Sequence, residues 1–250
     1  MRVFISGASS GLGRGLALHY ASPGTILGLC ARRADRLAEL ADAVRARGSR
    51  PIVHAVDVAD TKEMTKAAAE FVEQAGGVDL VVASAGISIP TGILAGKSEP
   101  IEQLFRINVI GVANTLVPFV PAMVAQKSGV LAAVASVAGH RAMPGRAAYG
   151  ASKAAIIEFM SALRMELHGT GVHAMALCPG FVHTPMTARL AHMPFVLDLD
   201  DAVPIMARAI ARRERTFTFP WQLRLLRSLL RSGPEWFIRR IAPAPRPEEG

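Results

Sequence analysis

Cysteine and long hydrophobic runs are both scarce in this sequence. Only two of the 250 residues are cysteines, Cys30 and Cys178, and each stands inside an apolar run. A disulfide framework is therefore excluded, and buried thiols in a reducing compartment are expected. No apolar run approaches the roughly 18 to 20 residues that would cross a bilayer. A strand-like run from Arg2 stands where a signal peptide would have its charged region, so we expect a cytoplasmic protein.

Linkers and internal repeats are also lacking. No Pro/Gly/Ser-rich stretch divides the middle of the chain, so 250 residues that are 51% hydrophobic predict one large α/β domain. The net charge of +8 is concentrated late, because ten Arg stand against four Glu from Ile205 onward. This basic region lacks the aromatic interleaving of a nucleic-acid groove, which excludes nucleic acid as a partner.

Short apolar runs alternate with segments of helical periodicity. Six runs without period-two alternation predict strands buried on both faces: Arg2–Ser6, Thr25–Ala31, Pro51–Val56, Leu80–Ala85, Val130–Ser136 and Val172–Cys178. The segments between them predict the helices Leu12–Ala21, Ala34–Arg47, Lys62–Ala75, Ile101–Gln126 and Ala148–His168. This alternation predicts a single-domain, Rossmann-type, doubly wound parallel sheet with helices on both faces. We expect the domain to span residues 1–220 and a basic amphipathic extension to span 221–250.

A glycine-rich turn joins the first predicted strand to the first predicted helix. Gly7, Gly11 and Gly13 let the backbone turn tightly and approach a ligand closely. The helix that follows points its free amides and partial positive charge at the same place. Structural turns use glycine too, but a turn placed between a strand and a helix predicts a pyrophosphate site.

The end of the second predicted strand carries arginines instead of an acid. An acid there would hold a ribose 2′-hydroxyl, whereas Arg32 and Arg33 suit a 2′-phosphate, with Arg14 as a further cation. NADP(H) is therefore favoured over NAD(H), although one arginine facing solvent at a helix start is the alternative. Asp57, after the third strand, could accept a hydrogen bond from adenine or cap a helix.

Tyr149 and Lys153 stand four residues apart in YGASK. On a helix they share one face, and an ammonium beside a phenol would lower the phenol pKa toward the range of a general acid or base. Such a pair alone is common by chance. Ser136, however, ends an apolar strand, so its hydroxyl would emerge at the sheet edge where the cofactor lies.

Taken in order, these motifs resemble those of the classical short-chain dehydrogenase/reductase (SDR) family. The resemblance covers roughly Arg2 to Thr184 and rests on Ser6–Gly13, Asp57–Val58, Ala83–Gly86, Asn108, Ser136, Tyr149–Lys153 and Pro179–Thr184. It implies hydride transfer between nicotinamide and a carbonyl or alcohol carbon. It also implies a homodimer or homotetramer built on the helices that carry Asn108 and Tyr149.

The resemblance further implies roles for individual residues. Tyr149 would exchange the hydroxyl proton, while Lys153 would lower its pKa and hold the nicotinamide ribose. Ser136 would position the substrate oxygen, and Asn108 would interrupt its helix and hold a water. The implied cofactor-binding residues are Ser6, Gly7, Ser9, Ser10, Gly11, Leu12, Gly13, Arg14, Arg32, Arg33, Asp57, Val58, Ala85, Gly86, Tyr149, Lys153, Pro179, Gly180, Val182 and Thr184. Two departures stand out: Ser6 replaces a threonine, and ASAG replaces Asn-Asn-Ala-Gly, which removes bracing side-chain amides.

Three segments after the later strands are expected to select the substrate: Ile87–Gly96, Val137–Ala147 and Pro185–Ala202. The last, within a lid at about 185–205, carries Leu190, Met193, Phe195, Val196 and Leu197. These side chains favour a lipophilic small-molecule substrate. His140 and His183 stand near the expected site, where satisfied polar roles are favoured over catalysis. No His, Cys, Asp or Glu cluster has metal-ligand spacing, so no metal is expected.

The C-terminal extension separates arginines from leucines on a helical wheel. One face carries Arg224, Arg227, Ser228 and Arg231, and the other carries Leu225, Leu226, Leu229 and Leu230. With Trp221 and Trp236, this helix could lie in a membrane interface or could pack within the protein or between subunits. The leading function is an NADP(H)-dependent carbonyl reductase or alcohol dehydrogenase. The alternatives are a catalytically idle NADP(H)-binding sensor and a membrane-docked adaptor.

Overall fold

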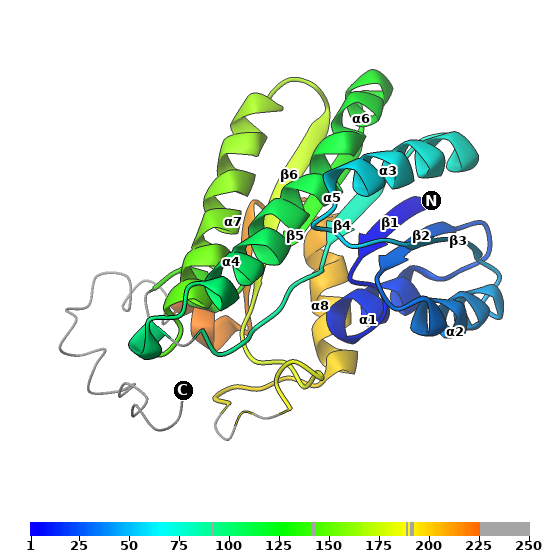
Figure 1. Cartoon of the computed structure of the whole chain (residues 1–250). Helices are drawn as coiled ribbons and strands as arrows, with labels where there is room; N and C mark the ends of the chain where they lie inside the picture. Colours follow the sequence, from blue (N-terminus) through cyan, green and yellow to red (C-terminus); the bar gives the residue numbers. More distant parts are fainter. Residues whose placement is uncertain (92, 142–143, 189, 191–192, 226–250) are drawn as a thin grey trace.

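The chain forms one parallel sheet between two layers of helices (Figure 1). This computed structural model describes residues 1–91, 93–141, 144–188, 190 and 193–225. Its seven strands have the order β3-β2-β1-β4-β5-β6-β7. They are β1 (Arg2–Ser6), β2 (Ile26–Ala31), β3 (Arg50–Ala55), β4 (Leu80–Ala83), β5 (Gly129–Val134), β6 (Val172–Pro179) and β7 (Thr216–Phe219). The order reverses between β1 and β4, which defines the switch point of a doubly wound sheet.

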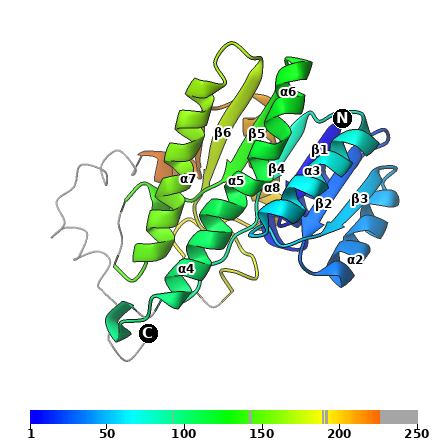
Figure 2. The ribbon, with the colours of Figure 1, turned by 45° about the horizontal axis from the view of Figure 1, so that its top comes forward.

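The helices are α1 (Gly11–Tyr20), α2 (Ala34–Arg45), α3 (Thr61–Ala75), α4 (Glu99–Phe105), α5 (Gly111–Leu116), α6 (Val120–Gln126), α7 (Ala147–Glu166) and α8 (Leu199–Ala211). α1, α2 and α8 cover one face of the sheet, and α3, α4, α5, α6 and α7 cover the other (Figures 1 and 2). Asp60 begins α3 as the sequence indicates, because its carboxylate accepts from the amides of Lys62 and Glu63 at 3.0 Å each.

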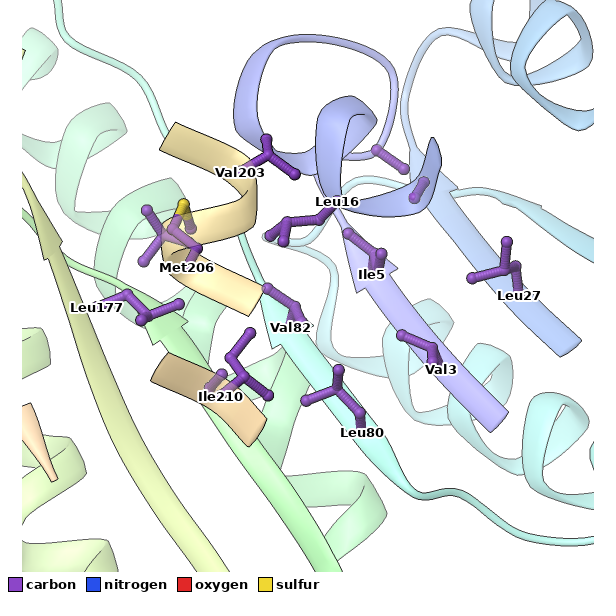
Figure 3. Close-up of a cluster of buried hydrophobic side chains, with 14 of the residues drawn as sticks. Val3, Ile5, Leu16, Leu27, Leu80, Val82, Leu177, Val203, Met206 and Ile210 are labelled. Carbon is purple, nitrogen blue, oxygen red and sulfur yellow. The ribbon is translucent and has the colours of Figure 1, made fainter. Parts of the chain in front are cut away.

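Alternate residues of the strands point to opposite faces of the sheet and pack into two hydrophobic cores. Val3 and Ile5 of β1 pack with Leu16 of α1 and Met206 of α8 on one face (Figure 3). Phe4, between them in sequence, points to the opposite face, where it packs against the rings of Phe71 and Phe119. Burial on both faces explains why the strands read as continuous apolar runs.

The six expected strands and the expected helices are present, with most ends within two residues of the prediction. The predicted helix Ile101–Gln126 is wrong as a single α-helix: it begins at Glu99 and is interrupted by a π-helical turn at Arg106–Ile110 and a 3₁₀ turn at Val117–Phe119. β7 and α8 were not expected. α8 contains Pro204 and lies where the sequence predicts the end of the lid, so residues 199–205 belong to the folded layer instead.

One helical segment departs, by its length and hydropathy, from the expectation that no apolar run is long enough to span a membrane. Residues 99–126 form a helical run of 28 residues with a mean hydropathy of 1.7 in its most apolar window, which is long and apolar enough to do so. Half of that window is buried within the fold, as for the core helix of a globular domain. Of the predicted C-terminal extension, only 221–225 lie within the described part of the chain, and these are helical. The remaining wheel residues and Trp236 lie outside it.

Candidate active site

The carboxyl ends of the strands open into one cleft of about 340 Å³. Its walls come from the turn after β1, the ends of β2 to β6, the start of α7 and the segment after β6. Eighteen of the expected site residues line it: Gly7, Ser9, Ser10, Gly11, Leu12, Arg32, Arg33, Asp57, Val58, Ala85, Gly86, Ser136, Tyr149, Lys153, Pro179, Gly180, Val182 and Thr184. Parallel strands bring these residues together because their carboxyl ends meet at one edge.

The glycine turn is packed too closely for side chains. A Cβ on Gly7, whose φ is +69°, would lie 2.6 Å from the Ala85 amide nitrogen. A Cβ on Gly13 would lie 2.4 Å from the Gly7 carbonyl oxygen. The turn therefore lies directly against α1 and the residues after β4, and Gly7, Ser9, Ser10, Gly11 and Leu12 line the cleft. This cradle fits a pyrophosphate group.

Three of the expected cofactor-binding residues and one expected catalytic residue do not line the cleft. Ser6 is fully buried, and its hydroxyl accepts from the Thr115 hydroxyl at 3.1 Å, which ties β1 to α5. Gly13 is buried beneath the turn, and Arg14 is exposed on α1. Asn108 is fully buried behind the cleft wall. Their positions in the sequence motifs did not indicate that these residues lie outside the cleft.

Both arginines after β2 contact side chains that line the cleft. Arg33 donates to the hydroxyls of Ser9 and Ser10, at 2.9 and 3.0 Å, and so bridges the glycine turn to the end of β2. Arg32 lies 3.7 Å from the Asp57 carboxylate at the end of β3. Asp57 also accepts from the Ala59 amide at 3.0 Å, so it both pairs with a cation and caps a turn. Arg33 is exposed, as the solvent-facing alternative expects, but its guanidinium is also held by these two hydroxyls at the cleft.

The three groups expected to act on the substrate come together at the end of β5 and the start of α7. Ser136, Tyr149 and Lys153 all line the cleft. The buried Lys153 ammonium donates to the Val134 carbonyl oxygen at 2.9 Å and lies 5.7 Å from the centre of the Tyr149 ring. The Ser136 hydroxyl accepts from the Ala138 amide at 3.2 Å, which fixes its direction at the strand end.

The expectation that Lys153 lowers the pKa of Tyr149 is wrong for this structure. Burial raises the pKa of the Tyr149 phenol above its ordinary value, while the Ser136 hydrogen bond and the positive charge of Arg146 act in the opposite direction. Burial also lowers the pKa of the Lys153 ammonium to about 8. The apolar surroundings thus disfavour the protonated form of this amine relative to a lysine in water.

Asn108 clamps the loop after β4. Its side chain accepts from the Ile87 amide at 2.8 Å and donates to the Ile87 carbonyl at 3.0 Å. It also lies 3.2 Å from the hydroxyl of Ser152, which donates to the Tyr149 carbonyl at 2.8 Å. The π-helical turn at Arg106–Ile110 frees Asn108 from regular helical packing, so the expected interruption is confirmed.

Thr187 is a cleft residue that sequence reasoning missed. Its hydroxyl donates to the Val182 carbonyl at 2.6 Å and accepts from the Thr184 amide at 3.1 Å. An isolated parallel bridge pairs Val182 with Leu197 in the segment after β6. Further lining residues that the sequence did not single out are Ala31, Val56, Ile107, Val134 and Ala135, whereas Ser84, Ile87, Pro185 and Met186 fall within the expected motif and substrate segments. The one signal in the sequence that could have identified Thr187 was a second hydroxyl side chain three residues after Thr184.

The two histidines near the site make polar contacts. His140 lies 3.1 Å from the buried Thr218 hydroxyl of β7, and His183 lies 4.0 Å from Asp198. Neither histidine lines the cleft. Within the part of the chain that the structure describes, no group of three His, Cys, Asp or Glu side chains could hold a metal ion.

A doubly wound sheet whose glycine turn and switch point face one cleft defines a Rossmann-type nucleotide-binding protein. The model of the short chain dehydrogenase family matches residues 1–194, so the chain belongs to this family of oxidoreductases. A relative from Myxococcus xanthus, named only as an uncharacterized oxidoreductase, is 40% identical over 220 residues, covering 88% of this chain and 87% of its own length.

Solved structures show the same fold. A short chain dehydrogenase from Mycobacterium paratuberculosis bound to NAD has a TM-score of 0.80 at 24% identity, covering 87% of this chain and 95% of that one. An alcohol dehydrogenase from Thermococcus sibiricus complexed with 5-hydroxy-NADP has a TM-score of 0.78 at 24% identity, with the same coverage of 87% and 95%. At these identities the likeness establishes the fold alone.

Proposed function

We propose that the protein transfers a hydride between a nicotinamide cofactor and the carbonyl or alcohol carbon of a small substrate. The observation that carries this proposal is the shared cleft, in which Ser136, Tyr149 and Lys153 lie with the glycine turn. The nicotinamide would supply the hydride when bound, and the protein would supply orientation, electrostatics and a proton.

Tyr149 would act as the general acid and base. In reduction, its hydroxyl would give a proton to the substrate oxygen as the carbonyl carbon gains the hydride, so that C=O becomes CH–OH. The raised pKa of the phenol keeps it protonated at neutral pH, which suits this direction. Ser136 would hold the substrate oxygen. Lys153, with a pKa of about 8, could return a proton to Tyr149 near neutral pH.

The cofactor would be NADP(H) in preference to NAD(H). Arg33 is anchored on Ser9 and Ser10 beside the turn that fits the pyrophosphate, where a guanidinium and two hydroxyls could share a 2′-phosphate. Arg32 adds a second cation, which Asp57 partly neutralises at 3.7 Å. Asp57 would face the adenosine end of the cofactor.

The substrate would be lipophilic. Met186 lines the cleft, and Phe195 in the lid is 49% exposed. Ile93 and Leu94, from the segment after β4, are also exposed. Of these exposed apolar side chains Met186 lines the cleft itself, and large exposed apolar side chains are typical of surfaces that receive an apolar ligand.

A homodimer or homotetramer would use the helices that carry Asn108 and Tyr149. Ile110 and Val117 stand seven residues apart on this layer and are 49% and 47% exposed.

A second surface lies at the start of the C-terminal extension, where Trp221 and Leu225 are exposed. Through this surface the extension would touch a membrane interface. Truncation after Trp221 should then reduce sedimentation with anionic liposomes, whereas unchanged sedimentation would contradict membrane contact.

An activity screen tests the function. The purified protein should oxidise NADPH in the presence of some members of a panel of aldehydes, ketones and acyl-chain ketones, with rates that rise with chain length. Binding of NADPH without turnover of any carbonyl would favour the idle sensor instead. Failure to bind either nicotinamide cofactor, with lipid binding intact, would favour the membrane-docked adaptor.

A further inference from the structure

Arg146 is a charged side chain beside Tyr149 that the chemistry above does not use. It immediately precedes α7 and is half-buried. The Gly150 amide donates to the Arg146 carbonyl at 2.7 Å, so the first turn of α7 already includes this residue. Residues three apart on such a turn have neighbouring side chains, about 5 to 6 Å between Cβ atoms. The guanidinium is close enough to pull down the pKa of the Tyr149 phenol.

The side chain of Arg146 reaches the loop after β4, beside the cleft; Arg146 and Ser88 do not line the cleft themselves, but their neighbours Tyr149 and Ile87 do. Its guanidinium donates to the Ser88 hydroxyl at 3.3 Å. Ser88 directly follows Ile87, which lines the cleft and is held on both its amide and its carbonyl by Asn108. This hydrogen bond therefore joins two of the segments expected to select the substrate.

The Arg146 guanidinium lacks an anionic partner within the described residues. None of the ion pairs among those residues includes Arg146, and its one hydrogen bond, to Ser88, is long. A guanidinium has five N–H donors in a planar fork that matches a carboxylate. Most of that donor capacity is left unused in a half-buried position, where an incoming anion would be bound strongly.

We propose that Arg146, together with Ser88, binds a carboxylate of the substrate. The substrate is then an oxo acid or hydroxy acid, with its carboxylate a few carbons from the reacting carbon. Its apolar chain lies toward Met186 and Phe195. This inference rests on the proposed hydride transfer and narrows it from lipophilic carbonyl compounds to amphiphilic ones. Arg146 would set the direction in which such a molecule enters the cleft.

Paired substrates test the inference. A series of aliphatic oxo acids, with one to four carbons between ketone and carboxylate, would be compared with their methyl esters using NADPH. The wild-type protein should prefer at least one acid over its ester by about tenfold or more in kcat/KM, as expected for a charge-assisted pair. In Arg146→Gln the ratio of kcat/KM for the acid to kcat/KM for the ester should fall toward one, mainly because the KM for the acid rises. Arg146→Lys should keep part of the preference for the acid, because lysine supplies the positive charge but not the planar donor geometry of the guanidinium.

Two controls separate this role from others. Arg208→Gln removes one exposed positive charge from α8 and should keep the wild-type preference. Ser88→Ala should lower the preference less than Arg146→Gln does. The inference is overturned if the wild type turns over esters as well as acids. It is also overturned if Arg146→Gln lowers both equally and shifts the pH profile, because Arg146 then acts on Tyr149. If the wild type reduces neither acids, esters nor any other carbonyl compound, the proposed function itself fails.

Discussion

The Lys153 ammonium donates to the Val134 carbonyl oxygen at 2.9 Å, and this contact places it 5.7 Å from the centre of the Tyr149 ring. A buried amine held by one carbonyl is costly to protonate, which is why its pKa falls to about 8. The proposed site therefore contains a cation whose charge depends on pH within a range that enzymes experience.

Lys153 should destabilise the folded protein at neutral pH. The unfolded chain protonates this amine below its ordinary pKa of 10.5, whereas the folded chain does so only below about 8. The folded state thus binds fewer protons between these values, and the free energy of unfolding falls as the pH drops through them. Lys153→Met should raise the free energy of unfolding at pH 7 by about 2 kcal/mol, even as activity is lost.

Urea unfolding at pH 7 and at pH 10 would measure this effect. Near pH 10 most of the advantage of the Lys153→Met variant should disappear, because this pH lies close to the unfolded-state pKa of 10.5, so little of the difference in proton affinity between the two states still acts. An advantage of equal size at both pH values would show that packing, and not ionisation, is responsible.

Gly7 should tolerate no side chain, and Gly24 offers a matched control. Both have positive φ, +69° and +80°, so alanine costs about 1 to 2 kcal/mol of backbone strain at either position. Only at Gly7 would the added Cβ also lie 2.6 Å from the Ala85 amide nitrogen, since nothing stands within 4 Å at Gly24. Thermal unfolding should show a larger loss for Gly7→Ala, together with weaker NADPH binding. Equal losses for the two variants would contradict the close approach of the turn to β4.

Arg33 should decide between the two nicotinamide cofactors. Arg33→Ala removes the guanidinium held by Ser9 and Ser10, so the Kd for NADPH should rise by about tenfold or more. The Kd for NADH should change by less than about threefold, since NADH carries no 2′-phosphate. Arg14→Ala, on the exposed side of α1, should have a smaller effect on NADPH. Calorimetric titrations of both cofactors give these values, and an equal change for NADPH and NADH would contradict the assignment.

Much of the fold can be predicted because the strands are buried on both faces. A continuous apolar run such as Arg2–Ser6 predicts a strand of a parallel sheet. The segments that follow these runs predict the helices. β7 was missed because it has four residues and follows a segment read as a lid. α8 was missed because Pro204 breaks its helical pattern and its apolar face resembles that of a lid. Only its packing against α1 identifies that face as core.

The motif residues of the site could be predicted, but their electrostatics could not. Strand ends place Ser136 and the glycine turn at one edge, so their meeting follows from the topology. The pKa values of Tyr149 and Lys153 depend on burial, which residue spacing does not give. Ser152 and Arg146 hydrogen-bond to residues far away in the sequence, Asn108 and Ser88, and no local pattern identifies these contacts.

The role of Tyr149 is the central claim, and one measurement tests it most directly. A carbonyl compound that the wild type reduces would be offered to wild type and Tyr149→Phe with NADPH deuterated at nicotinamide C4, and deuterium on the product carbon would be followed. The account predicts transfer of the label by the wild type and a loss of about 10²- to 10⁴-fold in kcat for Tyr149→Phe, with the Kd for NADPH nearly unchanged. Label transfer at the wild-type rate by Tyr149→Phe would contradict it.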